Sequence, residues 1–296
     1  MKEKEKNLRW GIEQRLEFIE FRLYWEGGIN RSDIVEYFGV SVPQASSDLS
    51  QYQQLAPKNM KYDRSLKRYF PSASFRPRFF KPDATRFLIQ LNFIARDVLD
   101  AGETWISKVP DFSAVPVPRR HIDLEHFKHV LRCTREGRSL EIRYQSLSAA
   151  RPKPIWRRIS PHAFGFDGMR WHVRAFCHID EVFKDFLLSR ILGVRKEGEP
   201  GAFPLEDEVW NEEIEVELVP HPGLSEEQKR VIASDFGMTQ GRLKVSIKLA
   251  MLYYLLKRLN LDFEEHKRPA REQHIVLADP ETVRTELQRA QGLIAA

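Results

Sequence analysis

The chain has 296 residues, of which 42% are hydrophobic and 30% are charged, and its net charge at neutral pH is +5. This composition is typical of a globular protein with two or three domains, and it excludes a largely disordered chain. No segment approaches the roughly 18 consecutive apolar residues of a membrane span, so we expect a cytoplasmic protein without a membrane partner. Cys133 and Cys177 form no CxxC pair, which argues against a disulfide framework or a structural zinc site. We therefore expect neither a metal nor a cofactor.

The charge is distributed unevenly along the chain. Residues 119–201 carry 17 Lys and Arg against 10 Asp and Glu, a net charge of +7, whereas residues 202–296 carry 12 against 17, a net charge of −5. A basic block inside a folded region is expected where a polyanion binds, although a solvated surface explains such blocks about as often. Charge alone therefore selects no function.

Three closely spaced helices are predicted at the N-terminus. The first has an apolar face and should end at residues 27–28, a Gly pair. Asn30 is placed to cap a second, short helix, which Gly39 ends. Ser41 begins a third helix only a few residues later, and the sequence from Ser41 to Gln44 resembles a capping box. So tight a connection predicts a helix-turn-helix. The apolar face of the first helix consists of Leu8, Ile12, Leu16, Ile19 and Leu23.

The third helix is predicted to read DNA bases. Glutamine side chains can form paired hydrogen bonds to an adenine edge, and serine serves several bases. In the alternative interpretation, Gln44 only closes the capping box and the other polar side chains face water, so Gln51 is the stronger candidate. The predicted buried side consists of Val42, Ala45, Leu49 and Tyr52, and the predicted exposed side of Gln44, Ser47, Gln51 and Gln54, with Asp48 as its only charge.

Residues 60–62 and 68–70 are predicted to pair as a hairpin, which would be the wing of a winged helix-turn-helix domain over residues 1–80. Its cations can neutralise phosphates beside the groove, although a plain basic hairpin is the alternative. The predicted DNA contacts are Arg31, Gln44, Ser46, Ser47 and Gln51, together with Lys58, Lys61, Arg64, Lys67 and Arg68 of the hairpin region.

Residues 81–136 are predicted to form a helical connector, with helices at 82–102 and 121–136 and a proline-rich interruption at 110–118. Packing within the chain would cover the apolar side of the first helix, and so would dimerisation. A dimer is attractive because two related half-sites on DNA require two-fold symmetry. The apolar side consists of Phe87, Leu88, Leu91, Ile94, Ala95, Val98 and Leu99, and the second helix continues the pattern through Leu124, Phe127, Val130 and Leu131.

Residues 137–200 are predicted to form a small β-barrel, because short β-rich runs alternate there with turn signals such as Phe166-Asp167-Gly168. The predicted strands are Leu140–Tyr144, Arg157–Ser160, Trp171–Cys177 and Phe186–Ile191.

Four segments of this region resemble the WYL-domain regulators: Ile142-x-Tyr144, Arg158 to His162, Asp167 to Ala175 and Phe186 to Ile191. The resemblance extends over the whole chain and implies an α+β multidomain fold. Its parts are a winged helix-turn-helix, a helical connector, a WYL domain of Sm-like β-barrel form and a C-terminal extension. The chain is most similar to the BrxR/CapW regulators of bacterial anti-phage systems, which implies a homodimeric repressor relieved by a ligand or signal. The family's Trp-Tyr-Leu is Trp171-His172-Val173 here.

The predicted strand 171–177 has one apolar and one mostly cationic face. Its cations and nearby hydroxyl groups can form a pocket for a nucleotide or nucleic-acid-like effector, since Arg binds phosphate and aromatic rings stack on bases. The family's sensing pocket maps onto these positions. Alternatively, Trp171 belongs to the core and His172 is a surface residue; the core is the favoured role for Trp171, and the pocket for Arg174 and Arg190. The predicted ligand contacts are Tyr144, Ser146, His162, Trp171, His172, Arg174 and Arg190.

The C-terminal region, residues 201–296, is predicted to alternate strands with helices, as the C-terminal extension of WYL regulators does. Strands are expected at 213–219, 242–248 and 274–277, and helices at 225–236, 249–261 and 281–291. No motif with chemistry of its own is found there.

Two other functions compete with a regulator. An enzyme could use His126 and His129, or His172 with Cys177 and His178, but no HExxH, GxSxG, P-loop or GxGxxG motif accompanies them, so no catalytic residue is predicted. An RNA or single-strand binding protein would use the Sm-like barrel and its basic block, but it would not explain the separate winged head.

Overall fold

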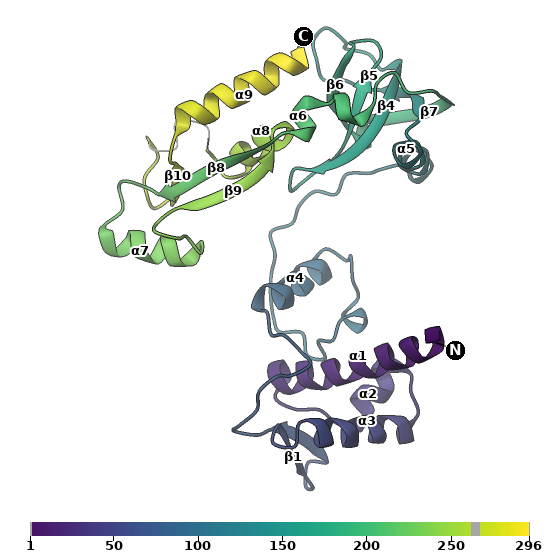
Figure 1. The fold of residues 1–296 in the computed structure, drawn as a ribbon, viewed down its shortest axis with the longest axis vertical. Coiled ribbons are helices and arrows are strands. Elements are labelled where there is room, and N and C mark those ends of the chain that lie inside the picture. The colour runs from purple at the N-terminus through teal and green to yellow at the C-terminus, as the bar shows by residue number, and fades with distance from the viewer. Residues whose placement is uncertain (1, 262–266, 296) are drawn as a thin grey trace. The chain divides into compact units, whose positions relative to one another are not determined.

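The computed structural model describes residues 2–261 and 267–295 and divides the chain into two compact units, residues 1–116 and 117–296 (Figure 1). The predicted connector is divided between them, because its two helices pack in different units. In the described residues no helix is both long and apolar enough to cross a membrane.

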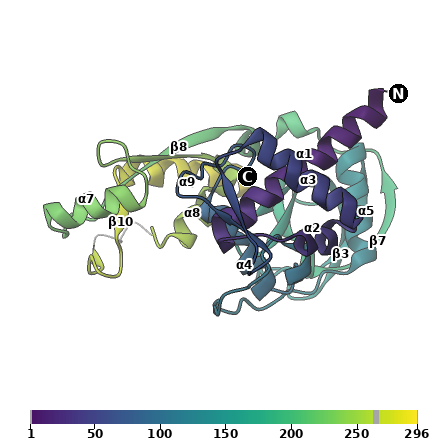
Figure 2. The same cartoon turned by 90° about the horizontal axis from the view of Figure 1, so that it is seen from below.

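The N-terminal unit begins with the three predicted helices: α1 (Lys2–Glu26), α2 (Arg31–Phe38) and α3 (Val42–Leu55). Asn30 and Ser41 cap their helices as expected from the sequence, but the full capping box predicted from Ser41 to Gln44 does not form. Asn30 and Asp33 form a capping box at the start of α2, and the hydroxyl of Ser41 accepts a hydrogen bond from the Gln44 backbone at the start of α3. Gly39 ends α2 with φ 63°, a left-handed conformation that favours glycine. Helix α1 crosses over α3 (Figures 1 and 2).

The predicted wing is confirmed as the antiparallel pair β1 (Met60–Asp63) and β2 (Arg68–Pro71). Ile29 forms an isolated bridge with Tyr69, which attaches the hairpin to the turn between α1 and α2. The head has one core, and the first helix contributes Leu16, Ile19 and Leu23 as predicted, while the side chain of Leu8 lies outside the described residues. The buried members are Leu16, Phe18, Ile19, Leu23, Ile29, Ile34, Ala45, Leu49, Tyr52, Ala56 and Met60.

A buried carboxylate that sequence reasoning missed anchors the chain after the wing. Glu20 is fully buried, and its Oε2 accepts hydrogen bonds of 2.6–2.8 Å from the backbone N–H groups of residues 78–80. Its Oε1 accepts a 2.9 Å hydrogen bond from the Tyr52 hydroxyl. Because a buried carboxylate is costly unless its oxygens are bonded, this set fixes the segment against α1.

The first connector helix is shorter than predicted. Helix α4 spans Ala84–Ala95, and a 3₁₀ turn follows at Ala101–Glu103. Leu91 is buried with Phe21 of α1 and Ile106, so part of the predicted apolar side packs within the chain. Leu88 and Val98 of the predicted side stay exposed in the single chain, and so do Ile89 and Phe93, which were not predicted to belong to it.

The C-terminal unit begins with α5 (Leu124–Glu136), which packs on a five-stranded antiparallel sheet. The strand order is β6-β5-β4-β3-β7. The predicted strand Phe186–Ile191 is wrong, because β6 ends at Leu187 and a 3₁₀ turn over 188–190 separates it from β7. The bounds are β3 (Ser139–Tyr144), β4 (Ile155–Phe166), β5 (Trp171–Cys177), β6 (Val182–Leu187) and β7 (Ile191–Gly198).

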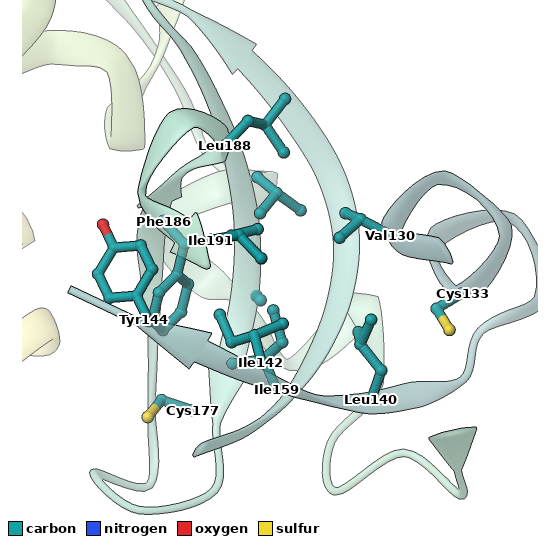
Figure 3. Packing of buried hydrophobic residues seen from close by; sticks show 12 residues of the cluster. Val130, Cys133, Leu140, Ile142, Tyr144, Ile159, Cys177, Phe186, Leu188 and Ile191 are labelled. Atoms are coloured by element: carbon teal, nitrogen blue, oxygen red, sulfur yellow. The ribbon is translucent and has the colours of Figure 1, made fainter. Parts of the chain in front are cut away.

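The core of this sheet consists of side chains from the strands, from the turn before β7 and from α5 (Figure 3). Val130 and Cys133 of α5 meet Leu140 and Ile142 of β3 there. Leu124, predicted to continue the apolar face of α5, is instead 67% exposed, because it lies in the first turn of the helix.

The remaining chain forms the predicted α/β region around a three-stranded sheet of order β10-β8-β9. A short helix, α6, was not predicted. Its neighbours pack around Val216, Leu252 and Leu256. The bounds are α6 (Glu208–Asn211), β8 (Glu213–Pro220), α7 (Glu226–Asp235), β9 (Leu243–Lys248), α8 (Leu252–Arg258), β10 (Ile275–Leu277) and α9 (Pro280–Ala295).

Candidate nucleic-acid interface and effector site

Helix α3 presents a polar surface that differs in two positions from the predicted one. Ala45, Leu49 and Tyr52 are buried as expected, but Val42 is 51% exposed because it lies in the first turn, at the edge of the core. Asp48, expected to be the exposed charge, is buried and bonds to Arg15 of α1 over 2.7 Å. The exposed face of α3 is therefore uncharged.

The predicted base-reading residues on α3 differ in whether their side chains already form hydrogen bonds within the protein. The Gln44 amide donates a 2.9 Å hydrogen bond to Asp48, so it does not close a capping box as the alternative proposed. The Ser46 hydroxyl donates to the carbonyl of Val42 within the helix. Ser47 is exposed and Gln51 is half-buried, and within residues 2–261 and 267–295 neither side chain has a hydrogen-bond partner.

The wing presents most of its cations to solvent. Lys61 on β1 and Arg64 and Lys67 in the turn are exposed, as are Lys58, which precedes the wing, and Arg31 at the start of α2. Arg68 differs, because it is half-buried and its Nη2 donates a 2.6 Å hydrogen bond to the carbonyl of Gly28. Arg68 therefore joins the wing to the turn after α1.

Two of the predicted effector residues on the sheet, Arg174 and His162, are buried beneath the C-terminal region. Arg174 of β5 is 1% exposed, and its guanidinium binds both oxygens of Asp207, over 2.7 and 2.9 Å. His162, at a bulge in β4, contacts the same carboxylate over 2.9 Å. Burial raises the pKa of Asp207, but the hydrogen bonds from His162 and Arg174 outweigh it, so the pKa lies below its usual value.

His172 is also paired with an acid rather than lying on the surface. It is 4% exposed, and its Nε2 lies 3.1 Å from Oδ2 of Asp167. Tyr254 of α8 covers it, with ring centroids 4.8 Å apart, and donates a hydrogen bond of 3.0 Å to Asp185. Burial raises the pKa of Asp167, but the hydrogen bonds from His172, Met169 and Arg170 hold it well below its usual range. The alternative that His172 is a surface residue is wrong.

The other predicted effector residues lie in different surroundings. Tyr144 is buried in the sheet core, where its hydroxyl accepts a hydrogen bond from the backbone of Leu187. Ser146 lies in the loop after β3, and Arg190 is half-buried in the turn before β7. The favoured prediction that Trp171 is a core residue is wrong, because it is 49% exposed and stacks on Phe166 at the end of the β4–β5 hairpin.

Sequence reasoning missed the carboxylates that meet these cations. Asp207 precedes α6 and caps it, and Asp185 lies on β6. The only local signal was Asp207 itself, an acid that can cap a helix through the backbone N–H of Trp210. The helix that it caps, α6, is too short to predict from the sequence.

The histidines considered for catalysis do not form one constellation. His129 pairs with Glu197, His126 contacts the carbonyl of Ile191, and His178 bonds to the Ser160 hydroxyl. Cys177 is buried. In the described residues no group of three or more His, Cys, Asp or Glu is arranged to hold a metal.

Three family models match the chain in the order of its domains. They are the BrxR transcriptional regulator winged helix-turn-helix domain at residues 11–93, the WYL domain at 125–196 and the BrxR transcriptional regulator C-terminal dimerization domain at 213–283. Together with the winged head and the five-stranded sheet, they define a WYL-domain transcriptional regulator.

Similar proteins that carry a name identify the particular family within this class. A DNA-binding transcriptional repressor CapW of Stenotrophomonas maltophilia is 41% identical over 279 residues, 94% of this chain and 92% of that protein. CapW of Pseudomonas aeruginosa is 40% identical over 87% of this chain and 85% of its own length, and CapW of Escherichia coli is 39% identical over 88% and 87%. The chain belongs to this CapW family of DNA-binding transcriptional repressors, which confirms the resemblance seen in the sequence.

A solved structure, the proteasome accessory factor B/C of Arthrobacter aurescens, also matches. It is 16% identical over 94% of this chain and 46% of its own length, with a TM-score of 0.29.

Proposed function

We propose that this protein is a cytoplasmic, homodimeric repressor that binds an inverted-repeat operator upstream of a bacterial phage-defence operon. The observation that carries the proposal is the uncharged polar face of α3 beside a cationic wing, in a chain 41% identical to a named repressor. The helix would read base edges, and the wing would neutralise phosphates without reading sequence.

Two observations support a homodimer. The C-terminal region matches a dimerization domain, and α4 leaves Leu88 61% exposed and Phe93 42% exposed in the single chain. Large apolar side chains grouped on one helix are typical of a surface that a partner covers. A two-fold axis would also place two recognition helices on two half-sites.

We further propose that a phosphate-bearing or nucleic-acid-like effector at the WYL domain relieves repression. The cations of β5 support an anionic ligand. Because they already pair with Asp207 and Asp167, the ligand has to compete with these carboxylates. An effector that reaches Arg174 must replace an internal carboxylate, so it would loosen the link between the sheet and α6. For the operator affinity to fall, such an effector must bind the conformation with the loosened link more tightly than the conformation that binds the operator.

Footprinting on the native upstream region tests the repressor. Protection of a discrete inverted repeat, together with derepression when the gene is deleted, is the expected result. Preferential binding of single-stranded nucleic acid, without protection of any duplex site, would favour the RNA-binding alternative and reject the repressor.

Arg190→Ala tests the effector. Arg190 is half-buried and makes no side-chain hydrogen bond or ion pair in the described part of the chain, so removing it should leave the fold intact. The variant should bind the operator normally while a reporter no longer responds to the inducing signal. Loss of operator binding by a folded variant would contradict an effector role.

A further inference from the structure

A second cationic region of the C-terminal unit is open to solvent. A hollow of about 570 Å³ lies between the turn that joins β4 to β5 and the C-terminal end of α8. This volume falls in the range of about 300–1,000 Å³ that is usual for small-molecule sites. Four cations line it: Arg120, Arg170, Lys257 and Arg258.

Among the described lining residues the hollow has one carboxylate, Asp167, whose hydrogen bonds leave it unable to pair with most of these cations. Oδ1 of Asp167 accepts hydrogen bonds from the backbone N–H groups of Met169 and Arg170, over 2.8 and 2.7 Å. Oδ2 contacts Nε of Arg170 over 2.7 Å and His172 over 3.1 Å. Asp167 therefore compensates Arg170, and its four lone-pair directions are used.

Among the residues that the structure describes, three cations of the hollow therefore remain uncompensated. Within the described ranges, Arg120, Lys257 and Arg258 have no carboxylate at ion-pair distance, and Lys257 contacts only the face of the Tyr253 ring, 5.8 Å from its centroid. Like charges gathered around one concavity repel each other, and an anion placed between them removes that cost.

The glycine of the turn leaves room for one of these cations. A Cβ added to Gly168 would lie 1.4 Å from Nη1 of Arg258, and Gly168 has φ +91°, a conformation that side-chain-bearing residues rarely adopt. The Arg258 guanidinium therefore lies where only glycine leaves room.

An apolar hollow adjoins the cationic one. It measures about 300 Å³, shares Asp167, Tyr254 and Arg258 with its neighbour, and is otherwise lined by Phe166, Gly168, Ile247, Met251 and Leu255. Phe166 is 44% exposed and is braced by its stack on Trp171, with centroids 4.8 Å apart. Exposed aromatic rings at a cationic site are a stacking surface for bases.

We propose that the two hollows together bind a nucleoside phosphate, with the phosphate among Arg120, Lys257 and Arg258 and the base against Phe166 and Met251. The ligand is either a free nucleotide or the phosphorylated end of a single strand. The site is separate from the buried Arg174–Asp207 pair. A regulatory role for this site rests on the proposed repressor function. Binding of the nucleoside phosphate does not, because it can be measured without operator DNA.

Isothermal titration of the full-length protein tests the site with four probes: adenosine 5′-monophosphate, adenosine, inorganic phosphate and a 5′-phosphorylated four-nucleotide DNA. The monophosphate should bind more tightly than adenosine or phosphate alone. Tighter binding of the tetranucleotide would identify a strand end as the source, and tighter binding of the monophosphate a free nucleotide. If none of the probes binds, or adenosine binds as tightly as its monophosphate, the proposal is overturned.

Two variants and a matched control locate the site. Arg258→Ala should weaken binding of the monophosphate about 10- to 100-fold, the loss expected for hydrogen bonds to a charged group. Phe166→Ala should weaken the monophosphate about 5-fold or more while leaving inorganic phosphate unchanged. Arg230→Ala removes the same charge from an exposed position on α7 and should change neither. Equal losses in Arg258→Ala and Arg230→Ala would reject a defined site.

These outcomes are separable from folding and from repression. Arg258 and Phe166 are exposed, so circular dichroism of both variants should match the parent protein. If Arg258→Ala nevertheless failed to fold, Arg258→Lys would retain the charge and should show an intermediate affinity, and an unchanged affinity would count against the site. Operator binding by the same samples reports the repressor function independently.

Discussion

At the scale of single residues, α3 offers a matched pair of glutamines. Gln51 and Gln53 are two positions apart, so they point to nearly opposite flanks of the helix. Gln51→Ala should weaken binding to the operator by about 1–3 kcal/mol and relax base preference, because it removes a base contact. Gln53→Ala should have little effect. Competition between operator and random duplex measures both variants, and equal losses on the two duplexes would remove the base-reading role of Gln51.

The wing cations should separate into two groups. Lys61→Ala should weaken binding to operator and random duplex alike and lower the slope of the salt dependence by about 1, because one phosphate contact is lost. Arg68→Ala should also lower the free energy of unfolding, by about 1 kcal/mol, because the hydrogen bond to Gly28 is lost. Titrations at several salt concentrations and urea unfolding would measure the two effects. Unchanged stability of Arg68→Ala would contradict its role as a link.

The buried Arg174–Asp207 pair should control the stability of the C-terminal unit. Arg174→Ala leaves a buried carboxylate without its main partner, so the free energy of unfolding should fall by about 3–5 kcal/mol. Urea unfolding followed by circular dichroism would measure it. This replaces the simpler expectation that Arg174 is a free ligand contact, and it makes Arg190 the better variant for testing the effector.

The same pair predicts a dependence of stability on pH. The pKa of Asp207 is lower in the folded than in the unfolded state, so its contribution is complete above the unfolded value of about 4 and is lost as the pH falls through the folded value. Asp207→Asn should therefore lose less stability than the parent protein on acidification below about pH 4. Parallel acid titrations would show this, and identical curves would argue against it.

At the scale of elements, α4 leaves large apolar side chains exposed in the single chain. Leu91 packs against α1, whereas Leu88 on its outer side is 61% exposed. If a second copy covers this side, Leu88→Asp should weaken dimerisation about 10-fold or more, since a charge replaces a buried apolar side chain. Leu147→Asp, in an exposed loop of the other unit, is the matched control. Sedimentation over a range of concentrations would compare them, and equal dimerisation would place the interface elsewhere.

At the scale of the whole molecule, the protein should be a dimer. Sedimentation at micromolar concentration should give twice the chain mass of 34.8 kDa. The physical reason is that one recognition helix contacts too little DNA for specificity, whereas two related by two-fold symmetry match an inverted repeat. A monomer that still protects a palindrome would contradict this.

Local patterns in the sequence determined most of the elements. The sequence predicted the caps at Asn30 and Ser41, the glycine at 39 and the paired strands of the wing, because each of these features depends on residues only a few positions apart. The alternation of the C-terminal strands and helices was readable for the same reason. Errors arose at element ends, as in α4 and β6, where no cap or periodicity marks the boundary.

Only the tertiary structure decided how the charged residues are used. Arg174 and Asp207 are 33 residues apart in the chain, as are Arg15 and Asp48, and the burial of each pair depends on which segments pack together. No local sequence pattern shows that two residues so far apart in the chain form a pair. The sequence by itself determined a winged head, a WYL sheet and a basic middle region. The fold decided that the cations of β5 face internal carboxylates, because the C-terminal region covers that side of the sheet, and that Arg258 and Lys257 line an open hollow.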